Sequence, residues 1–354
     1  MRRILLENVV TGMKLAKPLY SAEGTILLHA GIELNERFVN RIKELDVSYL
    51  YIEDDLTQDI DIPDVISEKT RVEAVVSAKN IIDQIKVGKG VDAGQAKKVA
   101  NTLVDELAKN QNVLLNFTDL RTCNDYLFNH SVSVAVLSIM AGIKLGYDEL
   151  RLRDLGVGAL LHDVGQTQVS KEILNKKSRL TPEESKEVRK HPVLGFEILR
   201  KNPDISLISA HCAFQHHERF DGTGYPRGLK GKEINQSAHI VAIADVFDAL
   251  TSDSPYRKAL SVHEALTIIG RYGNSYFDNE LIQIFTDNIA MYPIGTVVRL
   301  NNNQIGVVVD ISRESMNRPV IRIIIDENRK ALTSLIEIDL SKNTQLYIAD
   351  VVER

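Results

Sequence analysis

Residues 214–226 read FQHHERFDGTGYP, in which two adjacent histidines precede a glycine-rich turn that ends in Tyr-Pro. Neighbouring side chains on a helix point about 100° apart, and on a strand they point to opposite faces. The histidine pair is therefore poorly suited to an apolar stripe, which raises the question of what it binds. Gly222 and Gly224 can adopt positive φ, and Pro226 has a fixed φ, so the sequence predicts a rigid loop after the histidines.

The surrounding region places further histidines and aspartates at the ends of apolar helical stretches, or inside them. His130 opens the run HSVSVAVLSIM, and His162 and Asp163 close the run LGVGALLHD. His191 stands before a proline, and Asp245 lies inside HIVAIADVFDAL, where a lone buried carboxylate would cost several kcal/mol. Each position comes one or two helices after the previous one, so successive helices of a bundle could each bring one ligand to its core.

Five imidazoles and two carboxylates make up this candidate set: His130, His162, Asp163, His191, His216, His217 and Asp245. Such donors suit first-row metals, namely iron, manganese, zinc or nickel. Their number exceeds the capacity of one tetrahedral site, so we expect two metals that share a carboxylate, activate a water and clamp a phosphorus centre. The other histidines are expected to be ordinary core or surface residues: His29, His211, His239 and His263.

The composition is that of an ordinary globular protein, with 26% charged and 44% apolar residues among 354. The net charge of −5 argues against duplex DNA or an anionic membrane, so neither a nucleic acid polymer nor a membrane is expected as a partner. Cys123 and Cys212 form neither a disulfide framework nor a zinc motif, which favours a reducing compartment. Because no apolar run is long enough for a membrane span or a signal peptide, we expect a cytoplasmic location.

Changes in hydrophobic period divide the chain into four parts. Residues 1–53 are typical of a small β-rich domain, and the acidic residues 54–66 of a linker. Residues 67–290 show helical periodicity, whereas residues 291–354 contain four β-branched runs typical of a small antiparallel barrel or sheet. The expected fold is mainly α: a helical bundle around a dinuclear metal site, flanked by a small N-terminal α/β domain and a small C-terminal β domain.

The succession HDVG, HP, HHERFDGTGYPRGLKG and ADVFDALTSDSPYR resembles the HD-GYP family over roughly residues 120–285. The GYP at 224–226, with HHE before it, distinguishes this pattern from the broader HD phosphohydrolases. The resemblance implies a helical HD bundle that hydrolyses cyclic diguanylate (c-di-GMP), a bacterial second messenger, to linear pGpG and/or GMP. The two flanking regions also resemble, less specifically, the small N-terminal domain and the C-terminal β extension of such proteins.

The resemblance further implies two divalent metal ions, iron or manganese. One ion would be held by His130, His162, Asp163 and Asp245, and the other by Asp163, His191, His216 and His217, with Asp163 as the bridge. Trinuclear members carry a glutamate four residues before the first histidine, where this chain has Tyr126, so we expect two metals and not three. The expected catalytic residues are Asp163, His162 and Gln166.

The expected substrate-binding residues are Gly224, Tyr225, Pro226, Asp248, Ser254 and Arg257. Two positions depart from the family pattern. Gln166 stands where HDIGK has a lysine, and Ser254 stands where TSDRPYR has an arginine. Because the loss of one charge-stabilising donor can cost about 3 kcal/mol in the transition state, activity is expected to be reduced.

Three functions are compatible with these sequence features. The first is a phosphodiesterase of cyclic dinucleotides, and the intact ligand set favours it. The second is a catalytically degenerate module that binds nucleotides or partner proteins, and the two missing cations favour it. The third is an HD phosphohydrolase that acts on another phosphoester. Expected protein partners are signalling proteins such as diguanylate cyclase domains, together with a second copy of the chain in a homodimer.

Overall fold

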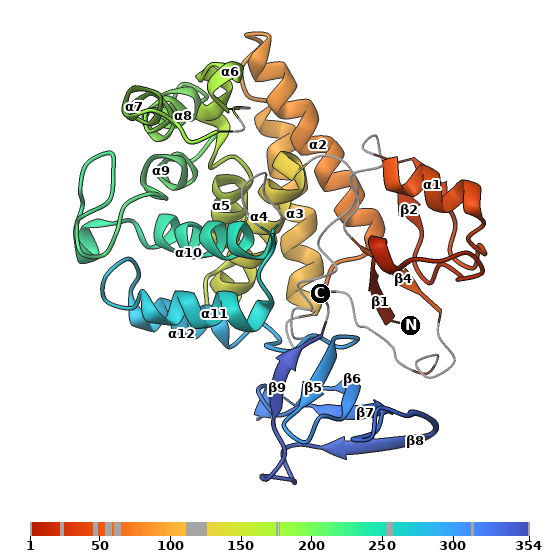
Figure 1. Cartoon of the computed structure of the whole chain (residues 1–354). Helices are drawn as coiled ribbons and strands as arrows, with labels where there is room; N and C mark the ends of the chain where they lie inside the picture. Colours follow the sequence, from red (N-terminus) through yellow and green to blue (C-terminus); the bar gives the residue numbers. More distant parts are fainter. Residues whose placement is uncertain are drawn as a thin grey trace. The chain divides into compact units, whose positions relative to one another are not determined.

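The computed structural model describes residues 2–21, 25–44, 49–53, 59, 65–110, 126–174, 176, 178–252, 258–312 and 315–352. The chain forms two compact units (Figure 1). The β-rich unit lies within residues 1–64 and 290–354, and the helical unit lies within residues 65–113 and 126–289. The fold is mainly α with small flanking β regions, as the sequence predicts. Most of the predicted linker, 54–66, falls outside the described residues, and the four-part division stays a prediction.

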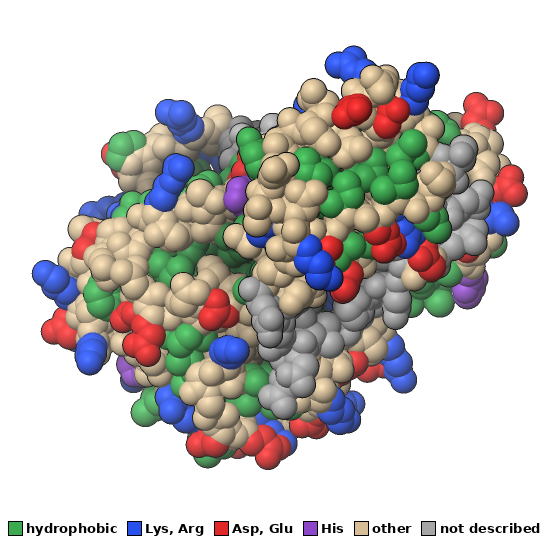
Figure 2. Space-filling view, turned by 90° about the horizontal axis from the view of Figure 1, so that it is seen from below, with side chains coloured by type: hydrophobic (Ala, Val, Ile, Leu, Met, Phe, Trp, Pro, Cys, Tyr) green, Lys and Arg blue, Asp and Glu red, His purple; other side chains and the backbone are tan. Residues whose placement is uncertain are grey.

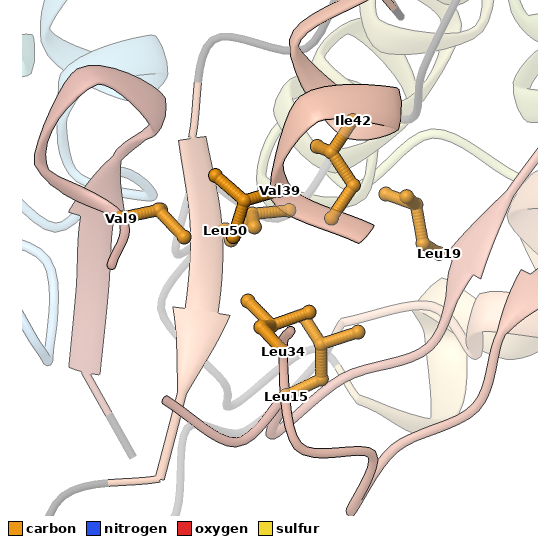
Figure 3. Packing of buried hydrophobic residues seen from close by; sticks show 7 residues of the cluster. All are labelled: Val9, Leu15, Leu19, Leu34, Val39, Ile42 and Leu50. Carbon is orange, nitrogen blue, oxygen red and sulfur yellow. The ribbon is translucent and has the colours of Figure 1, made fainter. Parts of the chain in front are cut away.

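The N-terminal part of the β-rich unit combines two short antiparallel strand pairs with one helix, which agrees with the predicted α/β domain. Its elements are β1 (Arg2–Leu5), η1 (Leu6–Asn8), β2 (Leu19–Tyr20), β3 (Ile26–Leu28), α1 (Glu36–Glu44) and β4 (Tyr49–Ile52). Strand β1 pairs with β4, and β2 pairs with β3. Figure 3 shows the core that these elements enclose: Val9, Leu15, Leu19, Leu34, Val39, Ile42 and Leu50.

The C-terminal part is a five-stranded antiparallel sheet in the order β8-β7-β6-β5-β9. Its strands are β5 (Val297–Leu300), β6 (Ile305–Asp310), β7 (Val320–Ile325), β8 (Ala331–Asp339) and β9 (Ile348–Val351). The sequence predicts four of them but misses β8, an edge strand whose side chains are largely exposed. On β7, Arg322 is buried and pairs with Asp59 at 2.6 Å and with Glu337 on β8 at 2.6 Å.

The helical unit lies in the region for which the sequence predicts helical periodicity, and it contains short helices that the sequence does not predict as well as the longer ones that it does. They are α2 (Glu68–Lys86), α3 (Ala93–Lys109), α4 (Tyr126–Lys144), α5 (Glu149–Leu160), η4 (Val164–Gln168), α6 (Lys171–Leu174), α7 (Pro182–Val188), α8 (His191–Arg200), α9 (Leu207–Gln215), η5 (Gly231–Glu233), α10 (Gln236–Thr251), α11 (Val262–Arg271) and α12 (Asn279–Thr286). Helix α4 packs against α5 and α10, and α5 also packs against α3 and α9 (Figure 1).

Helices α4 and α10 lie in the interior because their sequences are apolar on nearly every side. Residues 128–142 of α4 and 238–244 of α10 are all buried. A helix that is apolar all round is typical of the centre of a bundle. Small residues let neighbouring helices approach: a Cβ added to Gly158 on α5 would lie 2.7 Å from the Sγ of Cys212 on α9. Polar groups on these helices are therefore held deep in the protein.

The surface carries charges of both signs. Figure 2 shows Lys and Arg side chains interspersed with Asp and Glu side chains and with apolar areas, without a broad field of one sign on the face that it draws. Among the described residues, no helix is both long enough and apolar enough to cross a lipid bilayer.

Candidate metal centre

Five segments of the helical unit bring the predicted ligands together in two groups. One group contains Asp163, His191, His216 and His217, and the other contains His130, His162 and Asp245. Within each group the possible ligand atoms lie within 4.8 Å of one another. His130 comes from α4, His162 and Asp163 from the end of α5, His191 from the start of α8, His216 and His217 from the end of α9, and Asp245 from α10. All seven predicted ligands thus belong to the groups.

Two glycines bring the α5–η4 turn against helix α8. A Cβ added to Gly165 would lie 1.9 Å from the carbonyl oxygen of His191 and 2.5 Å from the nitrogen of Gly195. No side chain fits in that space, so only glycine allows this approach. The contact sets Asp163 beside His191, with 3.2 Å between the carboxylate Oδ1 and the imidazole Nε2.

Four of the histidines are anchored through Nδ1. The acceptors are the carbonyl of Ala159 for His162 (2.8 Å), the carbonyl of Val188 for His191 (2.8 Å), the carbonyl of Ala213 for His216 (3.0 Å) and the carboxylate of Asp248 for His130 (2.6 Å). Because a carbonyl oxygen only accepts, Nδ1 of His162, His191 and His216 carries the hydrogen, and in the neutral ring Nε2 presents a lone pair to the centre. This pattern is typical of metal-binding histidines, whose second nitrogen is fixed by a protein acceptor.

The Nε2 atoms of His162, His191 and His216 converge on the Asp163 carboxylate, at 3.5, 3.2 and 3.6 Å. The Nε2 atoms of His191 and His216 lie 3.2 Å apart. Two lone pairs in this position repel each other unless a cation lies near both. The Nε2 of His162 is buried and has no hydrogen-bond partner among the described residues. Buried polar atoms without partners are rare in proteins, so the centre fits a bound metal.

Both carboxylates are held in the ionised form. Burial raises the pKa of Asp163, but the neighbouring His162 and the hydrogen bond with His191 outweigh it and hold that pKa well below its usual value. Burial likewise raises the pKa of Asp245, but the hydrogen bond and charge of His130 bring it below the usual value. Ionised oxygen ligands beside imidazoles are a donor set that binds divalent first-row metals.

The imidazoles differ in their protonation behaviour. Burial lowers the pKa of His162 and, more strongly, that of His217, so both rings are held in the neutral form that binds metals. Burial also disfavours the charged form of His130, but hydrogen bonds with Asp245 and Asp248 reverse this and raise its pKa. A negative environment around His130 favours a cation, either a proton or a metal ion, at this end of the centre.

The Gly-Tyr-Pro loop lies directly against the centre. The ring of Tyr225 stacks on His217, with 4.7 Å between the ring centroids and 23° between the planes. The backbone N–H of Tyr225 also donates to the carbonyl of His217 at 3.1 Å. The peptide bond between Tyr225 and Pro226 is cis. The loop therefore forms one wall of the candidate site.

Two features hold this loop, and the sequence predicts neither. Glu218, buried at 2% exposure, accepts the N–H groups of Arg227 (2.8 Å) and Leu229 (3.0 Å). In the sequence, the position of Glu218 directly after the histidine pair was the signal that could have identified it. Gly222 uses the conformational freedom that the sequence offers, with φ of 83°, whereas Gly224 does not have a positive φ. A Cβ on Gly224 would instead lie 2.3 Å from the nitrogen of Arg219, so this glycine is needed for space.

The remaining predicted site residues lie at different depths. Gln166 is half-buried on η4. Asp248, predicted to contact the substrate, is buried and accepts hydrogen bonds from His130 (2.6 Å) and Ser252 (3.3 Å). Ser254 and Arg257 lie outside the described residues. The histidines expected to be ordinary belong to neither group: His29, His211, His239 and His263.

Comparison with protein families identifies the fold. A model described as an HD domain matches residues 105–281, half of the chain, and includes the HHE–GYP loop. The chain belongs to the HD-GYP family. A second model, a KOW domain associated with HD domains, matches residues 297–354 of this HD-GYP protein, which include the five-stranded sheet.

Two curated relatives and one solved structure are similar to this HD-GYP protein. The cyclic di-GMP phosphodiesterase PA4108 of Pseudomonas aeruginosa is 32% identical over 73% of this chain and 63% of its own length. A cyclic di-GMP phosphodiesterase of Thermotoga maritima is 37% identical over 49% of this chain and 46% of its own length. The chain thus spans about half to two thirds of these relatives. The Bdellovibrio bacteriovorus protein Bd1817, an HD-GYP protein, matches 80% of this chain and 98% of its own with a TM-score of 0.51 and 20% identity, a likeness in fold.

Proposed function

We propose that this HD-GYP protein is a metal-dependent phosphodiesterase that hydrolyses c-di-GMP to linear pGpG and GMP. The observation that carries the proposal is the pair of Nε2 atoms of His191 and His216, which face each other at 3.2 Å beside the Asp163 carboxylate. Divalent ions held there would activate water and neutralise phosphate charge. The two cyclic di-GMP phosphodiesterases similar to this chain support c-di-GMP as the substrate.

We assign two ions, iron or manganese, to the centre. His130, His162, Asp163 and Asp245 would hold one, and Asp163, His191, His216 and His217 the other. The two oxygens of Asp163 support its role as the bridge, since Oδ2 lies 3.5 Å from His162 Nε2 and Oδ1 lies 3.2 Å from His191 Nε2. Tyr126 lies one helical turn before His130 on α4 and has no carboxylate to hold a third ion.

Residues that hydrogen-bond to the ligands would fix the orientation of the ligating side chains. Asp248 accepts the Nδ1–H of His130 and is 2% exposed, so we propose that it orients this ring and does not contact the substrate. Partners of this kind fix both the tautomer and the direction of a ligating imidazole. His162 and Asp163 would act through the bound ions. The amide of Gln166 would donate a hydrogen bond to a phosphate oxygen.

The Gly-Tyr-Pro loop would contact the dinucleotide. Tyr225 stacks on His217, and its phenol lies in a site whose burial raises its pKa, so the hydroxyl stays protonated and can donate to the substrate. Gly224 and Pro226 would hold this ring in place. Ser254 and Arg257 remain proposed substrate contacts on the strength of the sequence alone. The cytoplasmic location, diguanylate cyclase partners and a homodimer likewise stay predictions.

Product analysis tests the proposed function. The full chain would be loaded anaerobically with iron or manganese and incubated with c-di-GMP and with other cyclic dinucleotides. We expect linear pGpG to appear first and to disappear when a chelator removes the metal. If metal-loaded protein converts no cyclic dinucleotide, the phosphodiesterase proposal is wrong, and binding of the intact nucleotide would then indicate a degenerate signalling module.

A further inference from the structure

Arg189 occupies a fixed position at the entrance to helix α8. It is the C-cap of α7, and its backbone N–H donates to the carbonyl of Ser185 at 3.0 Å. Helix α7 begins with a complete capping box formed by Thr181 and Glu184. Because only one residue separates Arg189 from His191, the backbone holds this arginine close to the metal centre.

The guanidinium of Arg189 lies over the outer member of two stacked rings. Its Cζ lies 4.9 Å from the centroid of the Tyr225 ring, and Tyr225 stacks in turn on His217. His217 contacts His191 with 4.9 Å between the ring centroids. A guanidinium placed over an aromatic face keeps its N–H donors free at the edge of the plane. The charge of Arg189 is therefore ordered next to the ligand group.

Neighbouring cations have other partners. Lys190 pairs with Glu187 at 2.5 Å, and Arg219 lies over the ring of Tyr276 at 3.7 Å. In the described part of the chain, no carboxylate lies within ion-pair distance of Arg189, which is exposed. Its donors are thus available to an anion from solution. Gln166, on the η4 turn that carries Asp163, supplies no charge.

We propose that Arg189 binds a phosphate of the substrate, in the manner of a bidentate guanidinium–phosphate contact, and so supplies a positive charge that Gln166 does not. This inference rests on the proposed phosphodiesterase function. A cyclic dinucleotide has two phosphates. Arg189 would hold the phosphate that is not cleaved, because it lies beyond Tyr225 and His217 and not within the ligand groups.

Kinetics of four metal-loaded proteins test this role: wild type, Arg189→Met, Arg189→Lys and Lys190→Met. Lys190→Met is the matched control, because it removes an adjacent exposed charge that is already paired. For c-di-GMP we expect Arg189→Met to raise KM about tenfold with kcat changed less than about twofold. Arg189→Lys should recover part of the affinity, since it keeps the charge but not the planar fork. Metal content should be equal in all four.

The same KM for Arg189→Met and Lys190→Met would overturn the proposal. A fall in kcat together with loss of metal would also overturn it, because Arg189 would then act by holding Tyr225 and His217. If the wild type converts no cyclic dinucleotide, the proposed function fails, and inorganic phosphate becomes the probe. Binding of phosphate to the metal-loaded proteins should then weaken in Arg189→Met and not in Lys190→Met, and equal binding would refute the Arg189 site.

Discussion

The helical unit and the β-rich unit differ in whether their buried polar side chains have protein partners. In the described part of the β-rich unit, the buried polar side chains are Thr296 and Arg322, and Arg322 has carboxylate partners in Asp59 and Glu337. The helical unit buries His162, His191 and His216 with their Nε2 atoms facing one another or facing no donor. Because burying an unsatisfied polar group costs free energy, this arrangement is explained by a ligand that the protein binds.

The interiors of the two units therefore serve different purposes. The β-rich unit contains apolar cores whose side chains offer no metal ligand, such as the cluster around Val298, Ile321 and Ile323. In the helical unit, interior helices also carry histidine and aspartate side chains, which an apolar core would exclude. Substitutions of these ligands in the helical unit should therefore remove metal and activity. Substitutions in the apolar cores of the β-rich unit should reduce stability alone.

The largest effect is expected for Asp163→Ala. This change removes the proposed bridge, so both ions should be lost and activity should fall at least about a thousandfold, roughly 4 kcal/mol in the transition state. Circular dichroism should still show a helical protein. Asp154→Ala is the control, because Asp154 lies on α5 of the same unit but outside both ligand groups. Full metal content in Asp163→Ala would show that the bridge is assigned wrongly.

Gly165→Ala is expected to act through packing. The added methyl group would collide with the backbone of α8 at His191 and Gly195, so η4 and α8 must separate. We expect stability to fall by about 1–3 kcal/mol, as for other overpacked sites, and metal affinity to fall with it. Gly270→Ala is the matched control, because a Cβ there meets nothing within 4 Å on helix α11. Denaturant unfolding measures the stability of the two variants, and metal analysis measures their metal content. If Gly165→Ala and Gly270→Ala have equal stability and equal metal content, the close packing of η4 on α8 is not needed for the centre.

Gln166→Lys should raise activity. An ammonium group here would stabilise the charge that develops on the phosphate, and a tenfold gain in kcat corresponds to about 1.4 kcal/mol. Ser254→Arg should act more on KM, because a guanidinium binds the ground-state phosphate as well. Steady-state kinetics with c-di-GMP separates the two parameters. No gain from either change would indicate that charge at these positions does not limit the enzyme.

The smallest effect belongs to the β-rich unit. Ile321→Val removes one methylene from a fully buried side chain on β7, which should cost about 1 kcal/mol of unfolding free energy. Metal content and kcat should stay at the wild-type values, because Ile321 lies in the unit without the ligand groups. Thermal unfolding and elemental analysis of the same sample measure both quantities. A loss of metal in Ile321→Val would show that the two units do not act separately.

Much of the candidate site could be predicted from the sequence. Histidines and aspartates that interrupt apolar helices, such as His130 and Asp245, are conspicuous because apolar neighbours exclude them without a partner. The helical character of residues 67–290 was predicted as well, since apolar residues in the longer helices recur at a regular period. Strand β8 was missed because an edge strand that exposes both faces has no such period.

Contacts between distant segments could not be predicted. The place of Asp248 behind His130 depends on the packing of α10 against α4, and the stack of Arg189 on Tyr225 depends on the path of two separate turns. The reason for a glycine at position 224 could not be predicted, because a sequence does not show whether a glycine is needed for φ or for space. The roles of Glu218 and Gly165 likewise depend on which backbone lies opposite them.

The metal-to-protein ratio of the loaded and desalted full chain shows whether the two ligand groups hold two ions. Elemental analysis should find about two ions of iron or manganese per chain in the wild type, as a two-metal phosphodiester site requires. The ions should leave together in Asp163→Ala and stay in Ile321→Val. Less than about one ion per chain after loading, or full occupancy without Asp163, would contradict the proposal that the two groups of histidines and aspartates hold a pair of metals.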